Sequence, residues 1–338
     1  MASAAPDAGI HCLPIPTPFR VGRVNCYLIE DDPLTLVDCG PNSGTSLDEL
    51  ERALAEHGRT VEDLELIVIT HQHIDHIGLV DVVARRSGAE IAALDRLGAW
   101  LGDYRREAER DDEFAEAVMA RHGVPQDVGQ ALRALSAAYR GWGSGARLTQ
   151  PLTDGGRLEL RDHTFEVLHR PGHSPSDTIF WDERRGLMLA GDHLIAHISS
   201  NPLVTRPLPP DTTERRPRAL RMYIDSMRQT RELPATLTLS GHGRPIADHR
   251  ALIDERFAST ERRAAKILGL LAEGPQTGYE LAQTMWGNVA VTQAFLTLSE
   301  VLGHLDLLAE QGLVAEEAGA DGVVRFEALA DGPLQPWS

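Results

Sequence analysis

Four short clusters of histidine and aspartate constrain this chain more than any other feature of its sequence. Each cluster directly follows an apolar run that is typical of a β-strand; the runs are 64–69, 165–168, 187–190 and 236–239. The side chains in these clusters that can bind a metal are His71, His73, Asp75, His76, His173, Asp192 and His242. Ligands on the loops after successive strands can converge at one edge of a sheet. One histidine in such a place is more often packed or solvated, but five histidines and two aspartates in this order predict a metal site.

The residue types indicate which metals and which chemistry to expect. Imidazole nitrogen and carboxylate oxygen suit zinc and other divalent first-row metals, and no thiolate lies in the clusters. Seven ligands are too many for one tetrahedral ion that keeps a position open, so we expect two ions, zinc first, with iron or manganese as alternatives. The ligands divide into one group, a second group and a bridge: His71, His73 and His173; Asp75, His76 and His242; and Asp192. Two ions about 3.5–4 Å apart hold a shared hydroxide and polarise the bond that it attacks, which predicts hydrolysis without a protein nucleophile.

The first cluster, with the spacing His-x-His-x-Asp-His over residues 71–76, resembles the motif of the metallo-β-lactamase superfamily, and the later ligands match in order. The resemblance covers about residues 10–250. It implies an α/β fold: a four-layer αββα sandwich in which two mixed sheets pack face to face between outer helices, with the metals at one edge. The commonest zinc β-lactamases carry Cys where this chain has Asp192, so we do not expect antibiotic hydrolysis. The pattern is closer to the glyoxalase II, lactonase and thioesterase members.

Residues near the first cluster provide further expectations. Asp38 resembles the family's aspartate before the first helix, which supports the metal site from outside; the alternative is a plain turn residue. Ser46 with Glu49 three residues later predicts a capping box and a helix that ends near His57. Gly78 lies where a backbone can approach the metal ligands closely. A barrel amidohydrolase, which also begins with His-x-His, is excluded because its bridging lysine has no counterpart: the only lysine is far downstream, in a separate helical region.

The composition predicts a soluble enzyme of the cytoplasm. A chain of 338 residues is long for one domain and comfortable for two, and its hydrophobic (42%) and charged (25%) fractions are ordinary for globular proteins. No apolar run reaches the roughly 18 residues that span a membrane, and the N-terminus has no signal-peptide pattern. The odd number of cysteines, Cys12, Cys26 and Cys39, favours buried thiols over disulfides and hence a reducing compartment.

The formal net charge of −17 argues against nucleic acid as a partner, because nucleic-acid binding depends on basic surface that neutralises phosphates. One modest basic cluster exists, and it comprises Arg215, Arg216, Arg218 and Arg221. Its place after a proline-rich loop favours a solvated helix start over a phosphate-binding surface.

The pattern predicts a metallo-β-lactamase-like catalytic domain over residues 1–250, with a helical insertion at about 95–147. Such an insertion commonly forms part of the substrate pocket in this superfamily; the alternative, favoured equally, is that its aromatic side chains only attach the helices to the sandwich. Residues 196–221 contain five prolines and follow Asp192, so we expect a stiff, irregular loop that passes near the metals. His193 and His197 fall on this side of the site and are not expected to be ligands.

Residues 251–338 form the second predicted domain. Three helices followed by a hairpin resemble a winged helix, which other members of the superfamily carry at the same end. Residues 262–338 contain four Lys or Arg against ten Asp or Glu, and no basic face is visible in the helix at 291–311. We therefore expect this domain to pack against the sandwich or a second subunit, as in a homo-oligomer, rather than to bind DNA.

These observations favour a dinuclear metal hydrolase that attacks a small acyl substrate (a thioester, ester or lactone) with a metal-bridging hydroxide, and in which Asp75 helps to hold the nucleophile and handle its proton. The alternative is a metal-dependent phosphodiesterase or endoribonuclease, since two-domain relatives include enzymes assigned to RNA cleavage. A third class, iron enzymes that reduce oxygen or nitric oxide, pairs this fold with a flavin domain that nothing here resembles.

Overall fold

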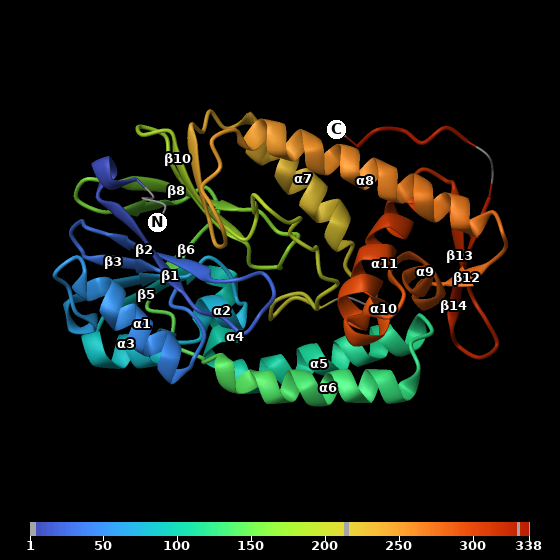
Figure 1. Ribbon diagram of the computed structural model, residues 1–338, viewed down its shortest axis with the longest axis horizontal. Coiled ribbons are helices and arrows are strands. Elements are labelled where there is room, and N and C mark those ends of the chain that lie inside the picture. Colours follow the sequence, from blue (N-terminus) through green and yellow to red (C-terminus); the bar gives the residue numbers. More distant parts are fainter. Residues whose placement is uncertain (1–4, 213–215, 330–331, 338) are drawn as a thin grey trace.

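The computed structural model describes residues 5–212, 216–329 and 332–337 (Figure 1). Arg215 of the basic cluster lies outside the described residues, as do small parts of the predicted ranges 1–250 and 251–338. Two mixed β-sheets stand face to face with helices on both outer sides, which confirms the predicted four-layer αββα sandwich.

The two sheets hold the strands in the orders β1-β2-β3-β4-β5-β6 and β11-β10-β9-β8-β7. The strands of the first sheet are β1 (Ile10–Ile15), β2 (Val24–Ile29), β3 (Thr35–Val37), β4 (Leu66–Val68), β5 (Glu90–Leu94) and β6 (Gln150–Leu152). Those of the second are β7 (Arg157–Glu159), β8 (Thr164–His169), β9 (Thr178–Asp182), β10 (Leu187–Gly191) and β11 (Leu237–Ser240). Strands β3 to β6 are parallel, and so are β10 and β11, while the other pairs are antiparallel.

Three apolar clusters hold the layers together. Between the sheets, Phe165 and Val167 of β8 share one buried cluster with Val68 of β4. The outer face of the first sheet packs against α1 (Gly44–Ala55) and α3 (Val80–Ser87), and that of the second against α7 (Ala219–Glu232). Because both faces of each sheet are covered, strand residues that point to either face are buried. This agrees with the near-continuous apolar runs in the sequence.

Helix α1 begins earlier than the sequence indicated. The predicted capping box at Ser46 and Glu49 is wrong: the N-cap is Ser43, whose Oγ accepts a hydrogen bond from the backbone N–H of Ser46 at 3.1 Å. The segment before the helix offers several small polar residues that can cap, and the one that precedes Gly44 is used. Short elements η1 (Pro6–Ala8), η2 (Val61–Asp63) and α2 (Ile74–Ile77) complete this half of the sandwich.

Helices connect β5 to β6. They are η3 (Asp95–Leu97), α4 (Gly98–Gly102), α5 (Tyr104–Arg121), α6 (Gln126–Tyr139) and η4 (Arg140–Trp142). Trp100 and Tyr104 are buried against the first sheet, and the indole N–H of Trp100 donates to Asp111 at 2.8 Å. Tyr139, by contrast, is 38% exposed and packs edge-on against Phe19. Some aromatic side chains of this segment therefore attach helices, while Tyr139 reaches the surface.

The chain beyond the sandwich folds into helices and a small sheet that extend the molecule along its long axis (Figure 1). The elements are α8 (His249–Leu271), β12 (Gln276–Thr277), α9 (Gly278–Trp286), α10 (Val289–Thr292), α11 (Ala294–Glu310), β13 (Val314–Ala318) and β14 (Val324–Ala328). The three strands pair in the order β12-β14-β13. Leu298, Leu302 and Leu305 of α11 share one buried cluster with α7 and α8, so this region packs against the sandwich half.

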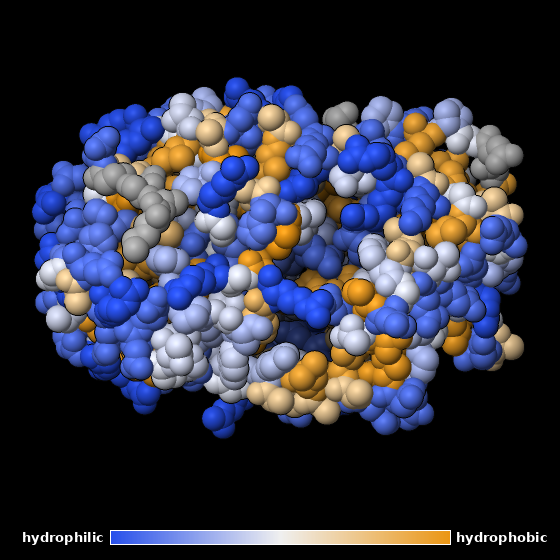
Figure 2. Space-filling model, viewed as in Figure 1, coloured by the Kyte–Doolittle hydropathy of each residue, from blue (hydrophilic) through white to orange (hydrophobic). Residues whose placement is uncertain are grey.

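The molecular surface is hollowed at its centre, between the sandwich and the C-terminal elements (Figure 2). Hydrophobic surface lies beside this hollow (Figure 2). Val289 and Val291 of α10 are among the exposed large apolar residues of the chain. Among the described helices, none is both long and apolar enough to cross a membrane.

Candidate metal centre

The structure brings all seven predicted side chains to one edge of the sandwich. His71 and His73 lie on the turn between β4 and α2, and His173 lies on the turn between β8 and β9. His73 Nδ1 stands 3.0 Å from His71 Nε2 and 2.9 Å from His173 Nε2. Three imidazole nitrogens this close can all face one ion, and their donor atoms form one of the groups with metal-binding geometry.

The second group comes from α2 and the turn after β11. Asp75 and His76 stand in the first turn of α2, and His242 Nε2 lies 3.4 Å from Asp75 Oδ2. Their donor atoms form another group that can hold an ion. Asp192, at the end of β10, faces both groups: its Oδ1 is 3.4 Å from His76 Nε2, and its Oδ2 is 3.4 Å from His242 Nε2 and 3.7 Å from His173 Nε2.

The residues fit a metal better than they fit one another. His76 Nε2, His242 Nε2 and Asp192 Oδ1 are buried and have no hydrogen-bond partner within the described part of the chain. An unsatisfied buried polar group costs about 1–3 kcal/mol. Three such atoms aimed at one space are expected of ligands that a divalent cation completes.

The histidine rings are oriented by partners on their outer nitrogens. His76 Nδ1 lies 2.8 Å from Asp38 Oδ2, His173 Nδ1 lies 3.1 Å from the carbonyl of Asn201, and His242 Nδ1 lies 2.8 Å from the carbonyl of Arg23. A hydrogen on each Nδ1 leaves the lone pair of Nε2 free to face the centre. His71 follows the same pattern with Thr70 Oγ1, whereas His73 presents Nδ1.

Asp38 has the supporting position that the sequence suggested. Besides His76, its carboxylate accepts from the backbone N–H of Thr70 at 2.9 Å and from the Thr70 hydroxyl at 2.8 Å. Among the described residues it is the only non-glycine with positive φ, at 58°. Such a backbone costs of order 1 kcal/mol or more and is kept at sites where the surrounding structure requires it.

The two groups differ in charge. Burial and the neighbouring His173 lower the pKa of His73 to about 3, and burial together with nearby histidines lowers the pKa of His71 well below its usual value. Burial also opposes protonation of His242, but the carboxylate of Asp192 outweighs it and raises the pKa of His242 to about 9. Burial works against ionisation of Asp192 as well, yet His76 and His242 lower its pKa well below the usual range. At neutral pH the first group therefore offers free lone pairs. In the second group the raised pKa of His242 favours the protonated ring beside the Asp192 carboxylate, and that proton has to leave before the ring can bind a metal.

Glycines at the site have distinct roles. A Cβ on Gly241 would lie 2.3 Å from Asp192 Oδ1 and 2.8 Å from His76 Cε1, so only glycine lets the backbone pass there. Gly78, expected to approach the ligands, approaches other backbone instead. A Cβ on Gly78 would lie 2.2 Å from Asn42 N and 2.4 Å from Trp142 O. The absence of a side chain at Gly78 therefore allows the insertion and the turn before α1 to pack closely there.

Sequence reasoning missed a buried polar network beneath His173. Ser174 Oγ donates to Asp177 Oδ1 at 2.9 Å and also lies 3.2 Å from Gln72 Oε1, to which Ser176 donates. Burial raises the pKa of Asp177 to about 6. The positions of Gln72 and Ser174 beside two motif histidines were the available signal. His193 and His197 are not part of the three candidate ligand groups, and His193 Nε2 contacts Thr230 Oγ1 at 2.9 Å.

Comparison with known proteins identifies the class. The family model for the Metallo-beta-lactamase superfamily matches residues 19–242, and that for the Metallo-beta-lactamase-like, C-terminal domain matches residues 264–329. The Probable metallo-hydrolase YqjP of Bacillus subtilis (strain 168) is 33% identical over 302 residues, which cover 89% of this chain and 92% of that protein. The crystal structure of a metallo-beta-lactamase family protein from Thermus thermophilus has a TM-score of 0.77 and 28% identity, covering 95% of this chain and 99% of that one. Hydroxyacylglutathione hydrolase GloC of Haemophilus influenzae is 25% identical over 181 residues, 52% of this chain and 69% of that protein.

The chain belongs to the metallo-β-lactamase superfamily. Within that class it is a metal-dependent hydrolase, and its C-terminal region matches a domain that accompanies this fold.

Proposed function

We propose that this protein is a dinuclear metal hydrolase that cleaves a small acyl substrate: a thioester, an ester or a lactone. The observation that carries the proposal is the pair of three-residue groups that Asp192 faces on both sides. One ion would be held by His71, His73 and His173, and the other by Asp75, His76 and His242. Zinc suits these ligands, and iron or manganese are the alternatives.

When bound, two such ions supply an activated water at neutral pH and polarise the carbonyl that it attacks. Asp75 is the residue we assign to holding and accepting the proton of the nucleophile. Its carboxylate lies at the centre, and despite burial the His242 ring, whose Nε2 is 3.4 Å from Asp75 Oδ2, lowers its pKa, which favours the carboxylate form that can accept a proton. Ser174 is buried and engaged with Asp177 and Gln72, which supports a mechanism without a serine nucleophile.

A cavity that borders the loop carrying His173 is a candidate for the apolar part of the substrate, and none of the seven proposed ligands lines it. It has a volume of about 300 Å³ and borders Gly172, Ser174 and Pro175 on the loop that carries His173. Leu203, Leu208 and Met222 supply much of the apolar remainder of its wall, with Arg96 and Asp211 as charged lining residues. This size is at the lower end of small-molecule pockets, and its lining suits the hydrocarbon part of an acyl group rather than a polyanion.

The charges of the C-terminal half support the proposal that nucleic acid is not a partner. The described arginines of the basic cluster all pair with carboxylates: Arg216 with Asp306, Arg218 with Glu310 and Arg221 with Asp225. Paired arginines have little left to offer a phosphate. We propose that residues 251–338 form a winged-helix-like domain that packs on the catalytic domain of residues 1–250. The order of helices and the sheet β12-β14-β13 supports this assignment.

Two experiments test the function. Elemental analysis of protein purified without added metal should give two ions per chain, and Asp192→Ala should lower both occupancy and turnover. A panel of thioesters, esters, lactones and phosphodiesters should then show turnover of an acyl compound, which Ser174→Ala retains. One ion per chain, a trapped covalent acyl-enzyme, or turnover of phosphodiesters alone would overturn the proposal, and the last outcome would favour a nuclease.

We also propose that the protein acts in the cytoplasm, supported by three cysteines without disulfides in the described residues. Burial raises the pKa of the Cys26 and Cys39 thiols well above its usual value, which keeps them unreactive. Assembly into a homo-oligomer stays a prediction; sedimentation of the full chain would show whether the exposed apolar surface near α10 is covered by a second copy.

A further inference from the structure

The segment Ile195–Pro207, which begins three residues after Asp192, is held in an unusual way. In the part of the chain that the structure describes, its residues make no backbone–backbone hydrogen bond. Buried backbone groups need partners, and here side chains provide several of them. The shape of this loop therefore depends on side chains that lie elsewhere in the chain.

This loop supports two of the proposed metal ligands. The carbonyl of Asn201 lies 3.1 Å from His173 Nδ1 and so orients that imidazole. The hydroxyl of Ser200 donates to the backbone carbonyl of Asp192. A shift of the loop would therefore change both the ring of His173 and the backbone that carries Asp192.

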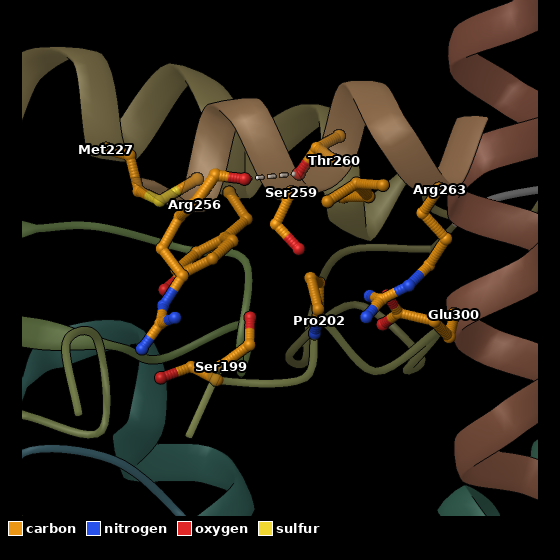
Figure 3. A pocket seen from close by; sticks show the side chains of 11 residues that line it. Ser199, Pro202, Met227, Arg256, Ser259, Thr260, Arg263 and Glu300 are labelled. Carbon is orange, nitrogen blue, oxygen red and sulfur yellow. Dashed lines mark hydrogen bonds and ion pairs between the residues drawn. The ribbon is translucent and has the colours of Figure 1, made fainter. Parts of the chain in front are cut away.

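Arg256, which lies on α8, binds two backbone carbonyls of this loop. Its guanidinium donates to the carbonyls of Ile195 at 3.1 Å and Ile198 at 2.9 Å, on either side of one turn of the loop. The Arg256 side chain is only 13% exposed, and Figure 3 shows it reaching from the helix toward Ser199. Hydrogen bonds from a charged donor are about twice as strong as neutral ones, and one group that binds two carbonyls fixes their spacing.

Helix α11 contacts the same loop further along. Ser299 Oγ accepts from the backbone N–H of Val204 at 3.2 Å, and the Asn201 side chain donates to the Leu296 carbonyl at 3.2 Å. Arg256 itself lies in the interval between the two segments that the family models match. The loop thus connects the metal centre to the C-terminal helices.

We propose that Arg256 is a positioning residue of the metal centre: it holds the loop at Ile195 and Ile198, and the loop in turn orients His173 through Asn201 and supports Asp192 through Ser200. The inference rests on the ligand set of the proposed function. It predicts that metal affinity depends on a side chain of α8 that touches neither metal nor ligand. Loss of an outer partner of a metal-bound histidine typically weakens metal binding about 10–100-fold, and Arg256 acts one contact further out, so we expect ~10-fold.

The test compares variants of the full chain in metal titrations. Metal-free protein is titrated with Zn²⁺ against a chromogenic chelator and with Co²⁺, whose absorption spectrum reports the coordination of each ion. Arg256→Met should weaken one of the two ions ~10-fold and change the Co²⁺ spectrum, and Arg256→Lys, which keeps one charged donor, should recover part of the affinity. Arg250→Met is the matched control, because Arg250 also donates from α8 to carbonyls, those of Arg231 at 2.9 Å and Leu233 at 3.1 Å, away from the metal centre.

The outcomes separate this inference from the ligand assignment. His173→Ala should weaken the same ion more strongly than Arg256→Met; unchanged binding of both ions in His173→Ala would refute the ligand set itself. If His173→Ala weakens binding but Arg256→Met binds both ions as tightly as the wild type, the ligand set stands and the positioning role is wrong. Equal effects of Arg256→Met and Arg250→Met would also overturn it. Should Arg256→Met fail to fold, Ser299→Ala tests the same loop at Val204, and unaltered affinity and Co²⁺ spectrum there would count against the inference.

Discussion

Replacing Gly241 by alanine should disable the metal centre through one methyl group. The backbone of Gly241 is fixed on both sides, since its N–H donates to Gly191 O at 2.6 Å and its carbonyl accepts from Asn25 N at 2.6 Å. Its φ lies outside the left-handed range, so alanine is compatible with the backbone conformation and the effect is purely steric. The new Cβ would stand 2.3 Å from Asp192 Oδ1.

The size of the effect follows from that distance. Non-bonded heavy atoms are comfortable at about 3.5 Å, so the Asp192 carboxylate has to move by roughly 1 Å. A misplacement of about 1 Å in catalytic geometry costs on the order of 100-fold in rate, and overpacking costs about 1–3 kcal/mol of stability. We therefore expect Gly241→Ala to lose ~100-fold in kcat/KM and part of its metal while remaining folded.

Metal content, the rate of substrate hydrolysis and stability in urea would be measured for the wild type and for Gly241→Ala. Gly269→Ala is the control, because no atom lies within 4 Å of its added Cβ and it sits inside α8. That change should leave metal and activity intact and stabilise the fold by about 1 kcal/mol. The reasoning fails if Gly241→Ala binds two ions with native affinity and keeps full activity.

Three further predictions concern residues around the centre and at the junction with the C-terminal region. Asp38→Asn should weaken metal binding ~10-fold or more, because it removes a carboxylate oxygen that holds His76 Nδ1. Competition with a chelator measures this change, and native affinity would contradict the orienting role. Asp306→Ala should lower the free energy of unfolding by about 3 kcal/mol, because the largely buried Arg216 guanidinium loses its two hydrogen bonds. Urea titrations measure this loss, and a value below about 1 kcal/mol would refute the prediction. Burial lowers the pKa of His122 from 6.5 to about 3. The unfolded chain therefore takes up a proton on this ring more readily than the folded chain does. The stability that His122 contributes is present above pH 6.5 and is lost as the pH falls toward 3. His122→Gln should accordingly lose less stability than the wild type between pH 7 and pH 5; identical pH dependence of the two melting temperatures would contradict it.

The edge of the sandwich could be predicted from the sequence because its information is local. A strand followed by a turn places the next polar side chain at the sheet edge, so the runs before His71, His173, Asp192 and His242 were sufficient to group them. Helix starts were less certain. Between Cys39 and Ser46 several residues can cap a helix, and tertiary contacts select Ser43, whose choice no local rule dictates.

Most supports of the site could not be predicted from spacing because they are not local. Asn201 lies 28 positions from His173, in a segment whose composition indicates only an irregular loop. Asp38 lies 38 positions from His76, and only the family resemblance indicated its role. Gly78 shows the same limit: its lack of a side chain was read correctly as a close approach, but the partner is backbone of the insertion rather than a ligand. Sequence spacing indicates candidate ligands, whereas their orientation depends on contacts that only the folded chain brings together.

This division between ligands and supports explains why the loop after Asp192 matters for the chemistry. A motif histidine offers either nitrogen, and it is the partner on the outer nitrogen that selects which one faces the centre. For His242 that partner is a backbone carbonyl of the β1–β2 loop. For His173 it is a backbone carbonyl of the loop that contacts α8 and α11. Backbone carbonyls cannot be removed by substitution, so changes in the side chains that hold those loops are one route by which this fold can alter its metal centre without altering a ligand. The C-terminal helices therefore belong to the description of the site even though they contribute none of its seven proposed ligands.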